Sequence, residues 1–159
     1  MLDLGEPPTT GFLVWRLALK WRAAVDRAVA PLGLTHAQYS LLASLLGVAR
    51  AGERPTQRQL ADHTGLDPIY VSKLARALES QGLVERVTDA DDARAVRLGL
   101  TEDGQAVATE AVAVVAALHH ELTAPLGGPG SDRTRDFAAT VHTLLAAPLP
   151  TPEQTGDPR

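Results

Sequence analysis

The stretch TQRQLADHTGLDPIYVSKLARALESQG, residues 56–82, decides the fold of this chain. Thr56 and Gln59 have the spacing of a capping box, so a helix begins there. Gly65 ends that short helix, and the aspartate–proline pair at 67–68 is a strong signal for the start of a second one. A short helix, a tight glycine turn and a second capped helix together predict a helix-turn-helix.

The second helix is predicted to run from Pro68 to Gln81, with Val71, Leu74 and Leu78 in the core. Lysine and arginine can donate to guanine in the major groove of DNA, and an apolar side chain can meet a thymine methyl. Solvated surface cations are the alternative, but the helix-turn-helix context favours DNA contact. The candidate DNA-binding residues of this helix are Pro68, Ile69, Tyr70, Ser72, Lys73 and Arg76.

A hairpin follows the helix-turn-helix directly. Val84 to Thr88 and residues 95–100 are two arms separated by a polar turn, and apolar residues alternate in the second arm. Such a hairpin would make the fold a winged helix. Arg94 at the tip can enter the minor groove, with Asp92 holding its guanidinium by a bidentate pair. A solvated turn is the alternative, because aspartates are common in turns.

The segments on either side of this region are helical and rich in apolar residues. Residues 11–33 and 101–147 carry more apolar surface than a three-helix core with a wing can cover, and large exposed patches mark interfaces. We therefore predict a mainly α fold with a small β-hairpin wing, in which residues 34–100 form the DNA-binding winged helix-turn-helix. The flanking helices would join an obligate two-fold dimer whose recognition helices lie about one DNA turn apart, ~34 Å. Residues 1–10 are predicted to be a flexible arm and 148–159 a disordered tail.

Composition excludes several classes of protein. The chain has 159 residues, 45% of them hydrophobic, and no cysteine, which excludes disulfides, thiolate metal sites and a thiol redox switch. No apolar run approaches the ~20 residues that span a bilayer, and no signal peptide is recognisable. We expect a cytoplasmic protein without a membrane partner.

The charge balance does not favour strong nonspecific DNA binding, and the motifs do not indicate an enzyme. Between Arg54 and Arg97 there are seven basic and seven acidic residues, so strong nonspecific binding to DNA is not expected. No catalytic triad, phosphate loop or paired-carboxylate pattern indicates an enzyme, and no cofactor is expected. His119 and His120 point about 100° apart on a helix, which suits a shared metal poorly, so no metal site is predicted.

Several short motifs occur in a characteristic order. They are Leu34-Thr35 with Gln38 and Leu42, then Leu60-Ala61, Val71-Ser72-Lys73-Leu74, Leu78-Glu79-Ser80-Gln81-Gly82-Leu83-Val84-Glu85-Arg86, Asp92-Ala93-Arg94 and Leu98-Gly99-Leu100-Thr101-Glu102-Asp103-Gly104. With this order and spacing the sequence resembles the multiple antibiotic resistance regulator (MarR) family of transcription factors, over roughly residues 10–147.

The resemblance implies a homodimer that binds a pseudo-palindromic operator in double-stranded DNA. Such a protein is usually a repressor, often of a neighbouring gene, and is often released by a small ligand. The resemblance also implies that Asp92 and Arg94 act in the wing, and that Ser72 and Lys73 lie where the family reads the major groove. Arginine is commoner than lysine at position 73, which leaves the base preference open.

Other residues are candidates for phosphate and effector contacts. Thr56, Gln57 and Arg86 could add phosphate contacts. An effector pocket between the dimer helices and the DNA-binding half, suited to a flat and partly apolar ligand, would draw on Trp15, Trp21, His36, Tyr39 and His119. Plain core packing is the alternative for each. Two other functions stay open, namely a constitutive winged-helix regulator without an effector and a helical interaction module that has lost DNA binding.

Overall fold

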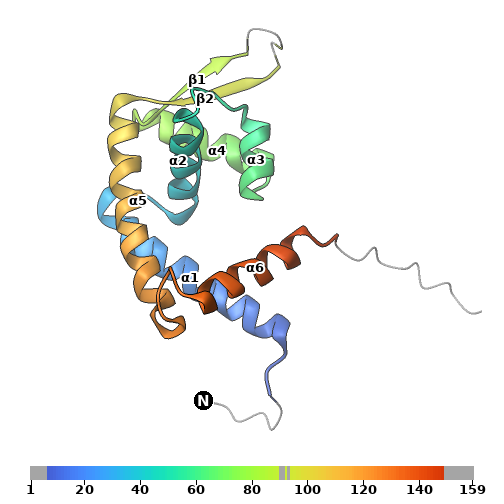
Figure 1. Cartoon of the computed structure of the whole chain (residues 1–159). Helices are drawn as coiled ribbons and strands as arrows, with labels where there is room; N and C mark the ends of the chain where they lie inside the picture. The colour runs from blue at the N-terminus through green and yellow to red at the C-terminus, as the bar shows by residue number, and fades with distance from the viewer. Residues whose placement is uncertain (1–6, 90–91, 93, 149–159) are drawn as a thin grey trace, which may run out of the picture. The chain divides into compact units, whose positions relative to one another are not determined.

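The structure is a computed structural model that describes residues 7–89, 92 and 94–148 (Figure 1). Most of the predicted arm 1–10 and tail 148–159 therefore lies outside the described residues. The elements are α1 (Thr10–Val29), a 3₁₀ turn (Ala30–Leu32), α2 (His36–Ala49), α3 (Gln57–Thr64), α4 (Pro68–Ser80), β1 (Val84–Thr88), β2 (Val96–Leu100), α5 (Glu102–Thr123), a second 3₁₀ turn (Ala124–Leu126) and α6 (Asp132–Ala146). The chain divides after Leu118 into two compact units. Across the described ranges, no helix has the length and apolarity needed to cross a membrane.

The helix-turn-helix is confirmed. At the start of α3, the Thr56 hydroxyl accepts from the Gln59 N–H, and the Gln59 side chain accepts from the Thr56 N–H at 2.8 Å. Gly65 ends α3 with φ of 69°, a left-handed conformation that glycine adopts without strain. The Asp67 carboxylate then caps α4 by accepting from the N–H groups of Ile69 and Tyr70.

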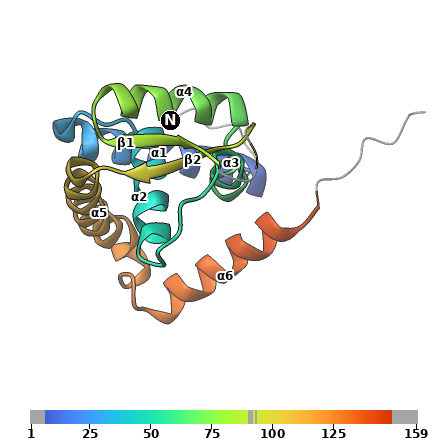
Figure 2. The same ribbon diagram turned by 90° about the horizontal axis from the view of Figure 1, so that it is seen from above.

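The core of the first unit forms around α2. The apolar face of α4 and the wing strands pack on this helix, with β1 next to α4 and β2 next to α2 and α3 (Figure 2). The largest fully buried side chains are Val25, Val29, Leu41, Leu42, Leu45, Leu60, Val71, Leu78 and Leu98. Burial of Val71 and Leu78 agrees with the helical phase predicted for α4, because both were expected to face inward.

The wing is a two-stranded antiparallel hairpin whose register pairs Val84 with Leu100 and Thr88 with Val96. Its second strand begins at Val96, one residue later than expected. An additional connection was not predicted. The Leu98 N–H donates to the Pro55 carbonyl at 2.9 Å, and Thr56 forms an isolated bridge with Arg97. These contacts tie the base of the wing to the start of α3.

The apolar residues of α1 and α5 are distributed differently from expectation. The buried residues of α1 are Ala24, Val25 and Val29, whereas its N-terminal half, Leu17 included, is exposed. In α5 the fully buried side chains are Ala108 and Ala111 rather than the larger valines. Small residues at this contact allow α5 to approach the core closely.

The second unit contains the end of α5 and α6. Ser131 caps α6 by accepting from the Thr134 N–H, as predicted, and the buried Thr134 hydroxyl donates to the Gly128 carbonyl at 2.7 Å. Beyond this cap, the apolar side chains of Phe137, Leu144 and Leu145 are exposed.

A tight junction fixes the start of α5 to the turn after α4. The Thr101 hydroxyl donates to the Gly82 carbonyl at 2.6 Å and accepts from the Gly104 N–H at 2.9 Å. Gly104 is buried, and a Cβ added to it would lie 1.8 Å from the carbonyl oxygen of Leu83. Because that oxygen belongs to the backbone, it cannot move aside as a flexible side chain would.

We expect Gly104→Ala to lower the free energy of unfolding by about 1–3 kcal/mol, the usual cost of overpacking. Gly47→Ala is the matched control, because Gly47 lies in α2 with no atom within 4 Å of an added Cβ. That control should gain about 0.5–1 kcal/mol from the helix preference for alanine. Denaturant unfolding of both variants at one protein concentration measures the difference, and equal effects would contradict the close approach at Gly104.

Candidate nucleic-acid interface

One face of α4 carries three of the six residues predicted to contact DNA from this helix. Ile69, Lys73 and Arg76 lie at spacings of four and three residues, so they share one side of the helix, and all three are exposed. We call these three residues the recognition stripe. Ile69 is 70% exposed, although it is fully apolar. Ser72 is half-buried beside the stripe.

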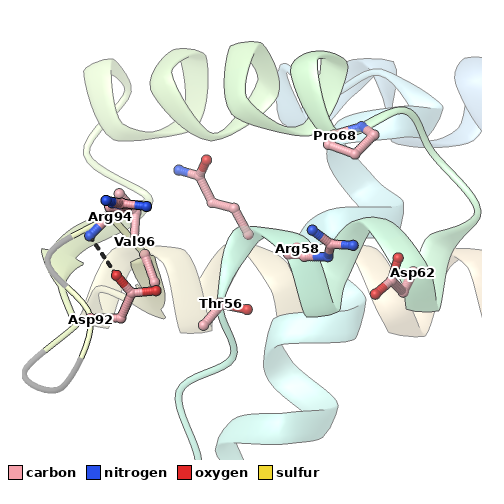
Figure 3. Close-up of a pocket in the computed structure, with 9 residues that line it drawn as sticks. Thr56, Arg58, Asp62, Pro68, Asp92, Arg94 and Val96 are labelled. Atoms are coloured by element: carbon pink, nitrogen blue, oxygen red, sulfur yellow. Dashed lines mark hydrogen bonds between the residues drawn. The ribbon is translucent and has the colours of Figure 1, made fainter.

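A groove with a volume of about 650 Å³ lies between the starts of α3 and α4 and the wing (Figure 3). It brings together candidates from three separate parts of the sequence. Its lining consists of Thr56, Gln57, Arg58, Asp62, Pro68, Asp92, Arg94, Ala95 and Val96. Two arginines and two aspartates balance its formal charge, which agrees with the neutral segment noted in the sequence.

Hydrogen-bond donors are available at the α3 side of this groove. The capping box uses the N–H groups of Thr56 and Gln59, whereas the first N–H groups of a helix have no partner within it. The Nε2 atom of Gln57 is buried and has no hydrogen-bond partner among the described residues. Gln57 therefore offers unused donors where α3 borders the groove.

The wing turn differs in detail from the predicted Asp92–Arg94 pair. The Asp92 carboxylate accepts from the backbone N–H of Arg94 at 2.9 Å (Figure 3). Within the described part of the wing, no ion pair joins this carboxylate to the Arg94 guanidinium. Asp92 thus shapes the turn, and the Arg94 side chain stays exposed.

Asp89 is a residue of the wing that the sequence reasoning missed. Its carboxylate, 5% exposed, forms an ion pair with Arg97 and accepts from the Asp92 N–H at 3.0 Å. Arg97 also donates to the Arg54 carbonyl at 2.6 Å. The register of the hairpin would have predicted this pair. Val87 lies opposite Arg97, so Asp89, two residues further along, is the diagonal neighbour of Arg97 on the same face of the hairpin.

Arg86, predicted as a phosphate contact, lies apart from this groove. Its guanidinium contacts the Glu79 carboxylate at 3.3 Å, and its side chain is 21% exposed. The pair connects the last turn of α4 to β1. Among the described residues, no group of three or more histidine and acidic side chains could hold a metal ion.

A second cavity, of about 530 Å³, reaches one of the five predicted effector residues. Its lining consists of Arg22, His36, Ala37, Ser40, Thr64, Leu66 and Tyr70. It contains His36 but not the other four. Tyr70, predicted to contact DNA, lies in this lining.

The remaining effector candidates have other surroundings. Trp15 is exposed on α1, and His119 belongs to the second unit. Trp21 and Tyr39 are partly buried against the core, and burial raises the pKa of the Tyr39 phenol because it desolvates the phenolate. Near the cavity, the Asp26 carboxylate accepts from the His36 N–H at 2.6 Å, which ties α1 to the start of α2.

Comparisons with known proteins agree with this architecture. A family model described as "MarR family" matches residues 32–95. An HTH-type transcriptional regulator of Bacillus subtilis, YdcH, is 37% identical over 111 residues, which are 70% of this chain and 76% of that protein. A solved structure of a mutant MarR from E. coli complexed with operator DNA is 29% identical, with a TM-score of 0.69 over 88% of this chain and 93% of that one.

A ligand-bound structure is also similar. PcaV, a transcriptional regulator from Streptomyces coelicolor in complex with its natural ligand, is 26% identical, with a TM-score of 0.75 over 92% of this chain and 97% of that one. The fold is therefore a winged helix-turn-helix, as the sequence predicted. On the strength of the family match and the 37% identical relative, the chain belongs to the MarR family of transcriptional regulators.

Proposed function

We propose that this protein is a homodimeric repressor that binds a pseudo-palindromic operator and is released by a small ligand. The observation that carries DNA binding is the exposed recognition stripe beside a groove that the wing borders. An α-helix with such a face fits the major groove, where lysine and arginine donate to guanine. The operator complex of the E. coli relative supports this proposal by similarity. A chromosomal operator implies a cytoplasmic protein.

Helix and wing would have different tasks. Lys73 and Arg76 would reach base edges or nearby phosphates, whereas Arg94 would enter the minor groove, whose base pattern is nearly degenerate. Gln57 would position the protein by donating to a phosphate from the start of α3. It lies beside Thr56, whose own N–H and hydroxyl donate to the Gln59 side chain. Asp92, which shapes the wing turn, would act through the placement of Arg94.

We expect Lys73→Ala or Arg76→Ala to cost about 1–3 kcal/mol per base contact and to relax preference at one position of each half-site. Arg94→Ala should weaken binding to operator and scrambled DNA more evenly, and each lost phosphate contact should make the salt slope shallower by about 0.9. The measurement is affinity at several salt concentrations for a duplex that the wild-type protein selects from a random pool, with a scrambled duplex beside it.

Arg27→Ala is the matched control, since it removes an exposed cation of α1, outside the recognition stripe and groove. It should change neither the affinity nor the salt slope. If Arg94→Ala behaves like Arg27→Ala, the wing has no part in DNA binding. If the wild-type protein selects no sequence at all, the interaction-module alternative replaces the repressor.

We infer the dimer from exposed apolar side chains on α1 and, separately, on α6. The first half of α1 exposes Phe12, Leu13 and Trp15, and α6 exposes Leu144 and Leu145, the last at 80%. Apolar area of this extent is costly in water, and a second copy of the chain would cover it.

Sedimentation should therefore give a dimer at micromolar concentration. Leu144→Glu combined with Leu145→Glu should shift it towards monomer, because carboxylates in an apolar interface lose hydration without gaining a partner. Asp136→Ala, an exposed change on α6, is the control and should leave the dimer intact. A wild-type monomer at this concentration would exclude the dimer.

The effector would occupy the cavity that contains His36. Arg22 can pair with an acidic group, Tyr70 and Ser40 offer hydroxyls, and Leu66 offers an apolar wall, which together suit a small aromatic acid. Because Tyr70 belongs to α4, a ligand there would touch the helix that carries the recognition stripe. Release from DNA requires a few kcal/mol of differential affinity between the two states.

We expect an aromatic acid or phenol from a broad panel to raise the melting temperature and to weaken operator binding. Arg22→Ala should abolish the response to carboxylates while leaving DNA affinity unchanged, because within the described residues Arg22 forms a single ion pair, a long one of 3.8 Å to Asp26. Arg27→Ala, which removes an exposed cation of α1 outside this cavity lining, is the control. A panel without any effect on DNA binding would favour the constitutive regulator.

A further inference from the structure

We propose that Ile69 recognises the methyl group of a thymine, so that each operator half-site has a preferred thymine opposite the first turn of α4. This inference rests on the proposed DNA binding and adds the identity of one base. Ile69 begins the recognition stripe, followed by Lys73 and Arg76. In the major groove, thymine is the one standard base that presents a methyl group, whereas the other base edges offer hydrogen-bonding groups there.

Exposure alone does not mark a DNA contact, because single exposed aliphatic side chains are ordinary on protein surfaces. The position of Ile69 is what distinguishes it. The N-terminal residues of the second helix of a helix-turn-helix are those that contact base edges. Ile69 lies there at 70% exposure, in line with two cations that suit guanine or phosphate. The apolar side chain of Ile69 can pack against a thymine methyl, whereas it cannot pair with the hydrogen-bonding groups of the other base edges.

The neighbours of Ile69, namely Asp67 and Tyr70, make other contacts. The Asp67 carboxylate accepts from the backbone N–H groups of Ile69 and Tyr70, so the start of α4 already holds a negative charge and is unsuited to a phosphate. Tyr70 lines the cavity with Arg22 and His36. In the first turn of α4, Ile69 is 70% exposed and Tyr70 is 42% exposed, so Ile69 is the more accessible of the two to a base edge.

The shape of isoleucine also favours this contact. A β-branched residue in a helix has essentially one χ1 rotamer, so the Cγ2 methyl and the Cγ1 atom of Ile69 are held in place before DNA binds. Little side-chain entropy is then lost on binding, whereas a flexible apolar side chain would lose more. A methyl contact made this way discriminates by apolar burial, which is worth about fourfold in affinity per methyl group.

The experiment removes the thymine methyl without changing base pairing. The wild-type protein first selects duplexes from a random pool, and the selected duplex is then prepared with deoxyuridine in place of each thymine in turn. We expect one position per half-site at which the replacement weakens wild-type binding about fourfold, and about 15-fold when both half-sites are changed. For Ile69→Ala, the same replacement should change affinity less than about twofold, which is the non-additivity expected of two groups in contact.

Two matched variants distinguish loss of this methyl contact from a general weakening of DNA binding. Ile69→Val keeps a branched apolar side chain and should keep the preference for thymine over deoxyuridine. Lys73→Ala should bind more weakly overall but retain the same preference. Sedimentation and thermal unfolding would show that each variant is folded.

The outcomes are distinct. Selected DNA that the wild-type protein binds equally with thymine or deoxyuridine would overturn the role of Ile69 while leaving the proposed repressor intact. A preference for thymine that survives in Ile69→Ala would also overturn it, because the methyl would then be read by another group. Failure to select any DNA sequence would overturn the proposed function, and the inference with it.

Discussion

The packing of α4 on the core determines which of its side chains are available to a ligand. Val71 and Leu78 are fully buried, and burial of side chains of this size stabilises the fold by about 1.5–3 kcal/mol each. Rotating the helix by one residue would expose both, so its orientation about its own axis is strongly held. Because α-helical residues are fixed relative to one another, the same packing sets the direction of the recognition stripe. The caps at Asp67 and Gly65 fix where the helix begins, and therefore which residue occupies its first turn.

The groove beside this helix depends on contacts of a different kind. Its two sides come from the helix-turn-helix, at α3 and the start of α4, and from the wing, which are distant in sequence. The bond from Leu98 to Pro55, the bridge between Thr56 and Arg97, and the contacts of Arg97 with Asp89 and the Arg54 carbonyl hold these sides together. An unpaired carboxylate as buried as Asp89 would be costly, so its pairing with Arg97 stabilises one arrangement of the wing. Arg94 thereby lies close to β2, a strand whose position is fixed against the start of α3.

The local parts of this structure could be predicted from the sequence, whereas the contacts between distant parts could not. Capping residues act over three or four positions, so Thr56, Asp67 and Ser131 mark helix starts correctly. The Asp89–Arg97 pair requires the hairpin register, and the bond to Pro55 requires a tertiary contact. A helical pattern separates buried from exposed positions, but it does not show that Tyr70, which is exposed like Ile69, also borders a cavity. The exposed apolar half of α1 likewise cannot be assigned from periodicity, which does not distinguish a core from an interface.

The two ends of α4 are held differently, and this bears on how a ligand could change DNA binding. At its C-terminal end, the turn at Gly82 and Leu83 is fixed to α5 by the Thr101 hydroxyl and by the close approach of Gly104. At its N-terminal end, Tyr70 borders a cavity of about 530 Å³ that can admit a small molecule. Displacing the well-packed end would require the backbone contact at Leu83 to open, whereas the N-terminal turn has space beside it. A ligand in the cavity would therefore act on the first turn of α4, where the exposed Ile69 lies, and would disturb the surface proposed to read bases before it disturbed the fold.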